Sequence, residues 1–434
     1  MGYIVGHPIK HPKDFYGRFQ EVARFYEIVA GDQAQSVNIL GLRRSGKTSF
    51  LQYIAHPEVM TRYLPDAQRY VIIYQDISIC KNTADFYHRI LSQLQRILKS
   101  RQPSHSWSLP EAGQAAIHDI ETFLPQFPEY RFILLLDEFD RLRTGQFDQN
   151  FLAELRALTI HWEYELACVT ASFWDIYQLG EYVSLQPTSP FYNIFYPSPI
   201  ILHGLEAAEI EQLIQTPAAE ENLPFSPKEL ATIYRLAGSL PFFIQATAAD
   251  SLRRKKQGES LSSAKAIRQL TANLSTYFKQ WWQQFSLLEQ EILCNVAQFN
   301  HTKNLTFNQD DIEVTKTRFI NFGLIRKVED TLTINGDIFT LWLNRKNSEN
   351  KKTNHQTTVK NSPYDKVLLK QKINTHFNKE EVDEICFDLN VDKGQLRTSR
   401  KAELVIDLID YLERRRSLPA LVTACQERRP HVDW

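Results

Sequence analysis

The octapeptide from Gly41 to Thr48 constrains the fold of this chain more than any other stretch. It reads Gly-Leu-Arg-Arg-Ser-Gly-Lys-Thr and fits the pattern G-x-x-x-x-G-K-[ST] without departure. An apolar stretch, Ser36–Leu40, precedes it, and a helical pattern from Thr48 to about Ala55 follows it. A strand, a glycine-containing loop and a helix in this order predict a phosphate-binding P-loop in an α/β domain.

The residue types in this loop suit a nucleoside triphosphate, ATP or GTP, that is bound together with Mg²⁺. Gly41 and Gly46 allow backbone angles and a close approach that a side chain would block. Backbone N–H groups and the start of the helix are expected to surround the phosphates. Lys47 is expected to reach the β- and γ-phosphate oxygens, and Thr48 to bind the Mg²⁺. The predicted nucleotide-binding residues of the loop are Gly41, Arg43, Arg44, Ser45, Gly46, Lys47, Thr48 and Ser49.

A second apolar stretch ends in two acids, which is the Walker B pattern. Residues 131–136 are followed by Asp137 and Glu138. Asp137 is expected to join Thr48 in holding the Mg²⁺, and Glu138 to polarise the attacking water. Glu138 and Lys47 are therefore the predicted catalytic residues. Asp140 is expected to be structural or to cap a helix.

The apolar stretch at residues 166–172 predicts the next strand, whose end is expected beside the γ-phosphate. Thr170 or Ser172 is a candidate sensor that would contact this phosphate through its hydroxyl. The alternative is an ordinary strand end whose hydroxyl groups are satisfied within the protein.

The composition sets bounds on the number of domains and on the class of partner. A chain of 434 residues, 43% hydrophobic and 23% charged, is expected to fold into two to four domains with real cores. Its formal net charge of -1 gives no global positive field that would attract nucleic acid or an anionic membrane. DNA is therefore an unlikely partner. The five cysteines are far apart, without zinc spacing, and are expected to be reduced and mostly buried.

Nothing in the sequence indicates export or membrane insertion. The first ten residues contain no signal-peptide apolar region, and the longest apolar runs are only as long as a strand. We therefore expect a soluble, cytoplasmic protein without a membrane partner.

Changes of pattern along the chain predict five segments. Short apolar runs alternate with helical patterns over residues 1–205, which favours a parallel sheet flanked by helices. Residues 206–284 have helical periodicity, interrupted at Gly238–Pro241, and residues 285–345 combine helices with a short strand pair at Gly323–Ile334, as in a winged helix. Residues 346–363 are polar and are expected to form a disordered linker. Residues 364–434 predict a small bundle of four helices, with Asn378 and Glu381 as a capping pair.

Two other features allow more than one interpretation. The basic run Arg253–Lys256 could contact nucleic acid, but a favourable helix C-terminus in solvent is the expected role. The pair Trp281 and Trp282 is expected to pack in a core or a lid rather than to stack on bases.

The nucleotide-site motifs together resemble the STAND branch of the AAA+ P-loop ATPases, which are signalling switches. The matching stretches are Phe15-Tyr16-Gly17-Arg18, Gly41–Thr48, Asp137-Glu138 and Gly238-Ser239-Leu240-Pro241. The resemblance implies a nucleotide domain, a helical lid and a winged helix, and it implies that Gly17, Arg18 and Pro241 contact the base and ribose. Residues 172–175 contain no arginine where many relatives have one, so an arginine finger is not assigned. Residues 334–337 match the Met-His-Asp sequence of some relatives only loosely.

The C-terminal bundle resembles an effector-associated domain, a death-like adaptor of bacterial conflict systems. The matching stretches are Glu384–Asp392, Lys401–Leu404, Tyr411–Arg415 and Arg429–Trp434. The resemblance implies a partner protein that carries a like domain together with an effector such as a protease, a nuclease or a TIR module.

These observations predict an ATP-dependent signalling switch that hydrolyses ATP slowly, forms a homo-oligomer when active and recruits an effector in bacterial defence or stress signalling. One alternative is a DNA-acting AAA+ ATPase that places a helix near residues 315–322 in a groove. A second alternative is a scaffold that holds a nucleotide without hydrolysing it.

Overall fold

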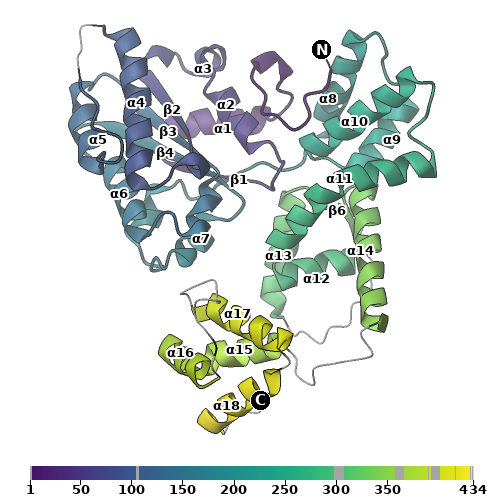
Figure 1. Ribbon diagram of the computed structural model, residues 1–434. Helices are drawn as coiled ribbons and strands as arrows, with labels where there is room; N and C mark the ends of the chain where they lie inside the picture. Colours follow the sequence, from purple (N-terminus) through teal and green to yellow (C-terminus); the bar gives the residue numbers. More distant parts are fainter. Residues whose placement is uncertain are drawn as a thin grey trace. The chain divides into compact units, whose positions relative to one another are not determined.

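The computed structural model describes residues 2–103, 107–297, 307–356, 366–389, 391, 401–415, 417–430, 432 and 434. The chain separates into two compact units, with the division between Arg345 and Lys346 (Figure 1). Each unit is described by itself below.

A five-stranded parallel sheet forms the centre of the first 205 residues (Figure 1). Its strand order is β2-β3-β4-β1-β5, so β4 lies between the strand that leads into the P-loop and the strand that ends in Asp137. The strands are β1 (Val37–Leu40), β2 (Tyr70–Asp76), β3 (Arg131–Asp137), β4 (Glu165–Ser172) and β5 (Ile200–Ile201). β1, β3 and β4 overlap the three apolar stretches in which the sequence analysis predicts strands.

Both faces of the sheet are covered by helices because β3 and β4 are apolar on both sides. Ile133 and Leu135 pack with α1, α2 and α3, whereas Leu134 and Leu136 pack on the other face with α4, α5 and α6. These helices are α1 (Phe19–Val29), α2 (Lys47–Ile54), α3 (Pro57–Tyr63), α4 (Thr83–Arg101), α5 (Ile117–Phe123), α6 (Gln149–Thr159) and α7 (Ile176–Tyr182). Short 3-10 helices are η1 (Pro12–Asp14), η2 (Ala67–Arg69), η3 (Ile77–Ile79), η4 (Leu124–Gln126), η5 (Phe139–Thr144) and η6 (Pro190–Ile194). The alternation along β3 therefore divides the core into two layers.

The rest of the first unit is mostly helical and shares one hydrophobic core with the end of the sheet. Leu42 and Phe173 from the sheet end belong to the same cluster as Phe243, Trp281 and Phe339. The elements are α8 (Ala207–Glu220), α9 (Pro227–Ala237), α10 (Pro241–Lys256), α11 (Ala264–Gln284), α12 (Leu287–Val296), α13 (Gln309–Asn321), β6 (Ile325–Val328), β7 (Thr331–Ile334) and the first part of α14 (Asp337–Gln356), whose residues from Lys346 onward belong to the second unit. The strands β6 and β7 pair antiparallel, as expected for the predicted strand pair.

The prediction that residues 346–363 form a disordered linker is wrong for residues 346–356, which continue α14 to Gln356. The start of this helix is fixed by the buried side chains of Ile338, Phe339 and Trp342. The following polar stretch contains neither glycine nor proline, so the helix can extend although it buries little apolar surface. Residues 357–363 lie outside the described residues.

The second unit is built from four helices around one core. They are α15 (Lys366–His376), α16 (Lys379–Asp388), α17 (Lys401–Arg414) and α18 (Leu418–Arg428). Buried side chains from all four meet, among them Ile373, Ile385, Leu408 and Leu421. The predicted capping pair is confirmed, since Asn378 and Glu381 exchange backbone-to-side-chain hydrogen bonds of 2.8 Å each at the start of α16.

Two further predictions can be compared with the described residues. All five cysteines are buried thiols, as expected from their spacing. Within the described part of the chain, no helix is long and apolar enough to cross a membrane.

Candidate nucleotide site

A pocket of about 360 Å³ lies at the P-loop, between the carboxyl end of the sheet and the start of α10. Its walls come from four parts of the first unit: the N-terminal segment 4–9, the turn at residues 14–18, the P-loop with Glu138, and the helices α8 and α10. The predicted residues that line it are Arg18, Arg43, Arg44, Ser45, Gly46, Lys47, Thr48, Ser49, Glu138 and Pro241. Gly17, Gly41, Asp137, Thr170 and Ser172 are not among the lining residues.

The P-loop has the compact geometry that its sequence requires. A Cβ at Gly41 would collide with the Ser45 Oγ, so a side chain at this position would displace the loop. Gly46 has a φ of 97° and is the N-cap of α2. The buried Ser45 Oγ has no hydrogen-bond partner in the described structure. This unsatisfied hydroxyl and the free N–H groups at the start of α2 suit an anionic ligand.

Lys47 lies between its own loop and a group of acids. Its Nζ donates hydrogen bonds to the carbonyl oxygens of Gly41 (2.8 Å) and Leu42 (3.2 Å). Burial lowers the pKa of Lys47, while the nearby carboxylates of Asp140 and Glu138 raise it. The ammonium group therefore lies close to the predicted Walker B acids, although these are about ninety residues away in the sequence.

The two Walker B acids have different surroundings. Asp137 is buried, and its Oδ1 accepts a hydrogen bond from the backbone N–H of Glu138 (2.9 Å), while its Oδ2 accepts one from the Tyr74 hydroxyl (2.8 Å). Glu138 has a left-handed backbone with a φ of 53° and lines the pocket. Burial raises the pKa of Glu138, against the positive charge of Lys47. A carboxylate with a raised pKa is a better proton acceptor than an ordinary one.

Sequence reasoning missed the contact that Tyr74 makes with Asp137. The parallel register of β2 and β3 pairs Asp76 with Asp137, which puts Tyr74 close enough to bond the Asp137 carboxylate. Only the pairing of strands 60 residues apart shows this contact.

The oxygen ligands needed for Mg²⁺ are present in part. Among the described residues, no group of three or more His, Cys, Asp or Glu side chains forms a metal site. Mg²⁺ bound with a nucleotide needs only one or two protein ligands, because phosphates and water supply the others. Thr48, which lines the pocket, and the buried Asp137, whose carboxylate is bonded to the backbone of the lining residue Glu138, are side chains of the type that fit that need.

The hydroxyl groups of the two candidate sensors, Thr170 and Ser172, are hydrogen-bonded within the protein. The Thr170 hydroxyl donates to Asn38 Oδ1 (3.0 Å), and the Ser172 hydroxyl donates to the Trp174 carbonyl oxygen (2.7 Å). Both side chains are fully buried and neither faces the pocket. Asn38 on the neighbouring strand satisfies the end of β4, a contact that sequence reasoning missed. Contact of Thr170 or Ser172 with a γ-phosphate stays a prediction.

Asp140 has the structural role that the sequence predicted. Its carboxylate accepts hydrogen bonds from the backbone N–H groups of Phe173 (2.9 Å) and Trp174 (3.2 Å). It thereby ties the loop after β3 to the loop after β4.

Gly17 and Arg18, both predicted to contact the base and ribose, differ in their position relative to the pocket. Arg18 lines the pocket and is held by an ion pair with Glu21 (2.9 Å) and a long hydrogen bond to the Ser45 carbonyl oxygen (3.4 Å). Gly17 does not line the pocket; it has a φ of 73°, and a Cβ there would lie 2.5 Å from the Glu209 carboxyl carbon. The absence of a side chain at Gly17 therefore permits this turn to pack closely against α8. The next residue, Arg18, lines the pocket.

The helices α10 and α11 hold the P-loop from its other side. The Trp281 indole N–H donates to the Arg43 carbonyl oxygen (2.9 Å). The Arg44 guanidinium lies 5.0 Å from the ring centres of both Phe242 and Tyr277. Trp281 thus packs in a hydrophobic core, one of the two places expected from the sequence, and its hydrogen bond reaches the loop itself.

The N-terminal segment is a wall of the pocket that sequence reasoning missed. The Ile9 N–H donates to Ser49 Oγ (3.1 Å), and the Ile4 N–H donates to Gln245 Oε1 (3.0 Å). These two contacts join the segment to α2 on one side and to α10 on the other. Since the contacts use backbone groups, no motif in residues 4–9 could have indicated them.

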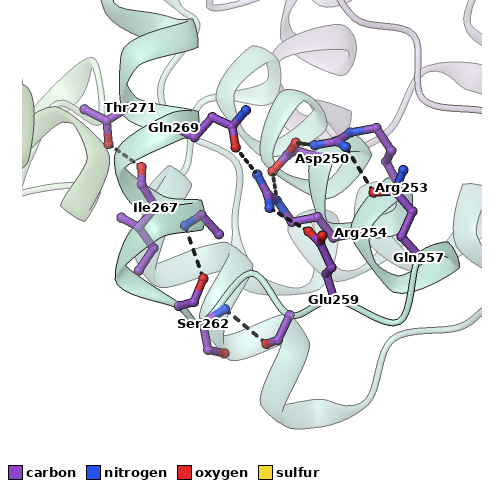
Figure 2. Close-up of polar contacts among 12 residues, drawn as sticks. Asp250, Arg253, Arg254, Gln257, Glu259, Ser262, Ile267, Gln269 and Thr271 are labelled. Atoms are coloured by element: carbon purple, nitrogen blue, oxygen red, sulfur yellow. Dashed lines mark hydrogen bonds and ion pairs between the residues drawn. The ribbon is translucent and has the colours of Figure 1, made fainter.

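The basic run at the end of α10 is neutralised within the protein. Arg254 contacts Asp250 (2.7 Å), Glu259 (3.1 Å) and Gln269 (3.1 Å), and Arg253 contacts the same Asp250 (Figure 2). The two lysines pair with acids as well, Lys255 with Glu229 and Lys256 with Glu221. The run is therefore a set of ion pairs at a helix C-terminus and does not present a phosphate-binding patch.

Comparison with solved structures establishes the fold. A Walker-type ATPase of Pyrococcus abyssi has a TM-score of 0.56 and 14% sequence identity, and the match covers 78% of this chain and 99% of that one. This chain has the α/β fold of the P-loop NTPases. The ORC2 protein of Aeropyrum pernix (TM-score 0.44, 15% identity, 80% and 97% covered) and the RuvB Holliday junction branch migration motor of Thermotoga maritima (0.38, 11%, 77% and 97%) are more remote.

Comparison with protein families identifies the C-terminal unit. Residues 368–430 match the family described as effector-associated domain 7. These residues lie in the second unit and include parts of all four of its helices. No curated protein matches the chain.

Proposed function

We propose that this chain is a STAND-type AAA+ switch, which binds and slowly hydrolyses ATP and recruits an effector protein through its C-terminal domain. One observation carries the proposal: a nucleotide-type pocket and an effector-associated domain occur in the same chain. A regulatory ATPase needs a ligand that favours one of two conformations, and it does not need fast turnover.

The construction of the pocket supports a switch. A ligand there touches the P-loop, the N-terminal segment and the start of α10 at Pro241. Among the described residues, Trp281 and Arg44 link the lid, residues 206–284, to the loop, and Leu42 packs with the lid in one hydrophobic core. A bound nucleotide would therefore add contacts between the lid and the sheet, and its loss would remove them.

Polar contacts join the residues just before α10, beside the pocket, to the strand pair β6–β7 and the residues next to it. Ser239 lies two residues before Pro241, and its Oγ accepts a hydrogen bond from Asn335 Nδ2 (2.7 Å). The same Nδ2 donates to the Gly323 carbonyl oxygen (2.8 Å), and Arg235 forms an ion pair with Asp337. A shift of the lid at Pro241 would strain these contacts, so the lid and the strand pair are expected to move together.

Hydrolysis would use Lys47, Thr48 and Glu138, which line the pocket, together with the buried Asp137 next to Glu138. Mg²⁺, held by Thr48 and Asp137, would neutralise charge on the phosphate oxygens when bound. Lys47 would exchange its bonds to the Gly41 and Leu42 carbonyls for phosphate oxygens. Glu138 would orient and deprotonate the attacking water.

The C-terminal domain supplies the output in this proposal. The expected partner is a protein that carries a like domain together with an effector, and the expected active form is a homo-oligomer. The setting would be the cytoplasm, in bacterial defence or stress signalling.

The proposal is tested with the full-length chain and with the variants Lys47→Ala and Glu138→Gln. Phosphate release and sedimentation are measured in ATP and in ADP. We expect slow release by the parent, larger assemblies in ATP than in ADP, accumulation of those assemblies in Glu138→Gln and their loss in Lys47→Ala. Equal sedimentation in both nucleotides would contradict the switch, and a parent that binds no nucleotide would contradict the site.

The alternative of a DNA-acting ATPase has less support. The helix α13, which a winged helix would place in a groove, exposes Asp310, Asp311 and Glu313 near its start. Its Arg318 faces inward and stacks on Phe173 (4.7 Å from the ring centre). An acidic helix start opposes contact with phosphates.

A further inference from the structure

Three arginines line the pocket in the described part of the chain, and they differ in what holds their side chains. Arg18 is buried at the start of α1, where its Nη1 pairs with Glu21 at 2.9 Å and its Nη2 lies 3.4 Å from the Ser45 carbonyl oxygen. Its charge is therefore already compensated by an adjacent carboxylate, and its position is set by the fold.

Arg44 is held by the lid. Its guanidinium lies over the rings of Phe242 and Tyr277, 5.0 Å from each centre, and its backbone has a φ of 72°. A guanidinium held between two aromatic rings stabilises the contact of loop and lid. It cannot turn toward a phosphate without breaking that contact.

Arg43 has the opposite arrangement, with a fixed backbone and an exposed side chain. Its carbonyl oxygen accepts the Trp281 indole N–H at 2.9 Å, while its side chain lines the pocket. Arg43 lines the same pocket as Lys47, which is expected to contact the phosphate oxygens, and Glu138, the candidate base. This is the place at which the terminal phosphate of a bound nucleotide would react.

We propose that Arg43 is a catalytic residue of this chain, whose guanidinium stabilises the charge that develops on the terminal phosphoryl group during hydrolysis. The inference rests on the proposed ATPase function. In the step, the water oxygen bonds to the γ-phosphorus, and the bond from that phosphorus to the β–γ bridging oxygen breaks. ADP leaves with the electron pair on that oxygen, and the water proton passes to Glu138 and on to solvent.

Because Arg43 is part of the P-loop, the positive charge that assists the reaction would come from the same chain that binds the nucleotide. In other phosphoryl-transfer enzymes such a guanidinium comes from the same protein or from a partner. Here Trp281 of α11 fixes the backbone of the residue that carries it, so the position of the lid would influence the rate as well as the affinity.

The test compares the full-length parent with Arg43→Ala and with Arg43→Met, which keeps the length of the side chain but removes its charge. Arg62→Ala, an exposed arginine on α3, is the control. Three quantities are measured: affinity for ADP, affinity for ADP with aluminium fluoride, which imitates the transferring phosphoryl group, and single-turnover phosphate release. Arg43→Lys tests whether charge alone restores part of the rate.

We expect both neutral variants to bind ADP within about threefold of the parent, because transition-state contacts contribute little to ground-state binding. Phosphate release should fall roughly 100- to 1000-fold. The extra affinity that aluminium fluoride confers on ADP should be lost. Arg43→Lys should recover part of the rate of phosphate release and part of the extra affinity that aluminium fluoride confers. The control Arg62→Ala should match the parent.

Two results would overturn the inference while the proposed function stands: neutral variants that hydrolyse at the parent's rate, or an equal loss of ADP affinity and rate, which would make Arg43 a binding residue only. A parent that binds ADP but releases no phosphate would defeat the proposed hydrolysis and the inference together. Retained ADP binding by each variant shows that it is folded.

Discussion

The indole N–H of Trp281 lies 2.9 Å from the carbonyl oxygen of Arg43 and donates a hydrogen bond to it. This contact joins α11 to the second variable position of the P-loop across 238 residues of sequence. The hydrogen bond ties α11 to the backbone of the loop that is expected to bind phosphates. The position of α11 and the geometry of the loop therefore depend on one another.

Trp281→Phe should keep the aromatic packing of the lid and remove this hydrogen bond. Loss of a single buried hydrogen bond costs about 1–3 kcal/mol when the acceptor is left unsatisfied. We expect a lower melting temperature and weaker ATP binding, measured by thermal melts and calorimetric titration. Trp282→Phe, at the neighbouring position, is the control and should leave ATP affinity unchanged.

Lys47→Ala should abolish measurable ATP binding, because its ammonium is the group that can exchange the Gly41 and Leu42 carbonyls for phosphate oxygens. Calorimetric titration with ATP measures the effect, and Lys279→Ala, an exposed lysine on α11, serves as the control. A variant that binds ATP as tightly as the parent would show that the P-loop assignment is wrong.

Glu138→Gln should separate binding from turnover. The amide keeps the shape of the side chain but cannot accept the water proton, so phosphate release should fall roughly 100- to 1000-fold while ATP stays bound. Rapid-filtration measurement of bound ATP over time, beside phosphate release, checks both parts. Release at the parent's rate would exclude Glu138 as the catalytic base.

The C-terminal unit should fold by itself when expressed as residues 364–434. Its core is formed by its own four helices. Within that fragment, Phe377→Ala should cost about 3–5 kcal/mol, because Phe377 is only 2% exposed. Phe387→Ala, at a position that is 80% exposed, should melt like the parent fragment. Circular dichroism during heating distinguishes the two variants, and an unfolded parent fragment would contradict the prediction.

The same fragment should lose stability in acid partly through Glu381. Hydrogen bonding from the Asn378 N–H and the ion pair with Arg429 (2.6 Å) lower the pKa of Glu381. A lowered folded-state pKa gives stability that is present above the unfolded-state pKa and is lost as the pH falls through the folded-state pKa. Glu381→Gln should therefore melt a few degrees lower at neutral pH, with the difference vanishing in acid. Glu384→Gln, exposed on the same helix, is the control, and a difference that persists in strong acid would contradict this reasoning.

Contiguous patterns were enough to predict several elements of this protein. The P-loop motif directly follows the end of β1 and includes the start of α2, so its local geometry follows from residues that are neighbours in the chain. The capping pair of α16 is equally local, since Asn378 and Glu381 are three residues apart. The polar stretch after Arg345 led to a wrong prediction of a disordered linker. The helix that contains this stretch, α14, begins with apolar residues that precede it.

The contacts that complete the site depend on the tertiary structure. Tyr74 reaches Asp137 only through the register of two strands, and Asn38 satisfies Thr170 only because β1 and β4 pair. Arg43 and Arg44 are adjacent and identical in type, so the sequence cannot distinguish them. The left-handed backbone of Arg44 and the rings of α10 and α11 hold one guanidinium against the lid, and the other is left facing the pocket. Their difference is decided by packing between segments about 200 residues apart in the chain, which no local pattern records.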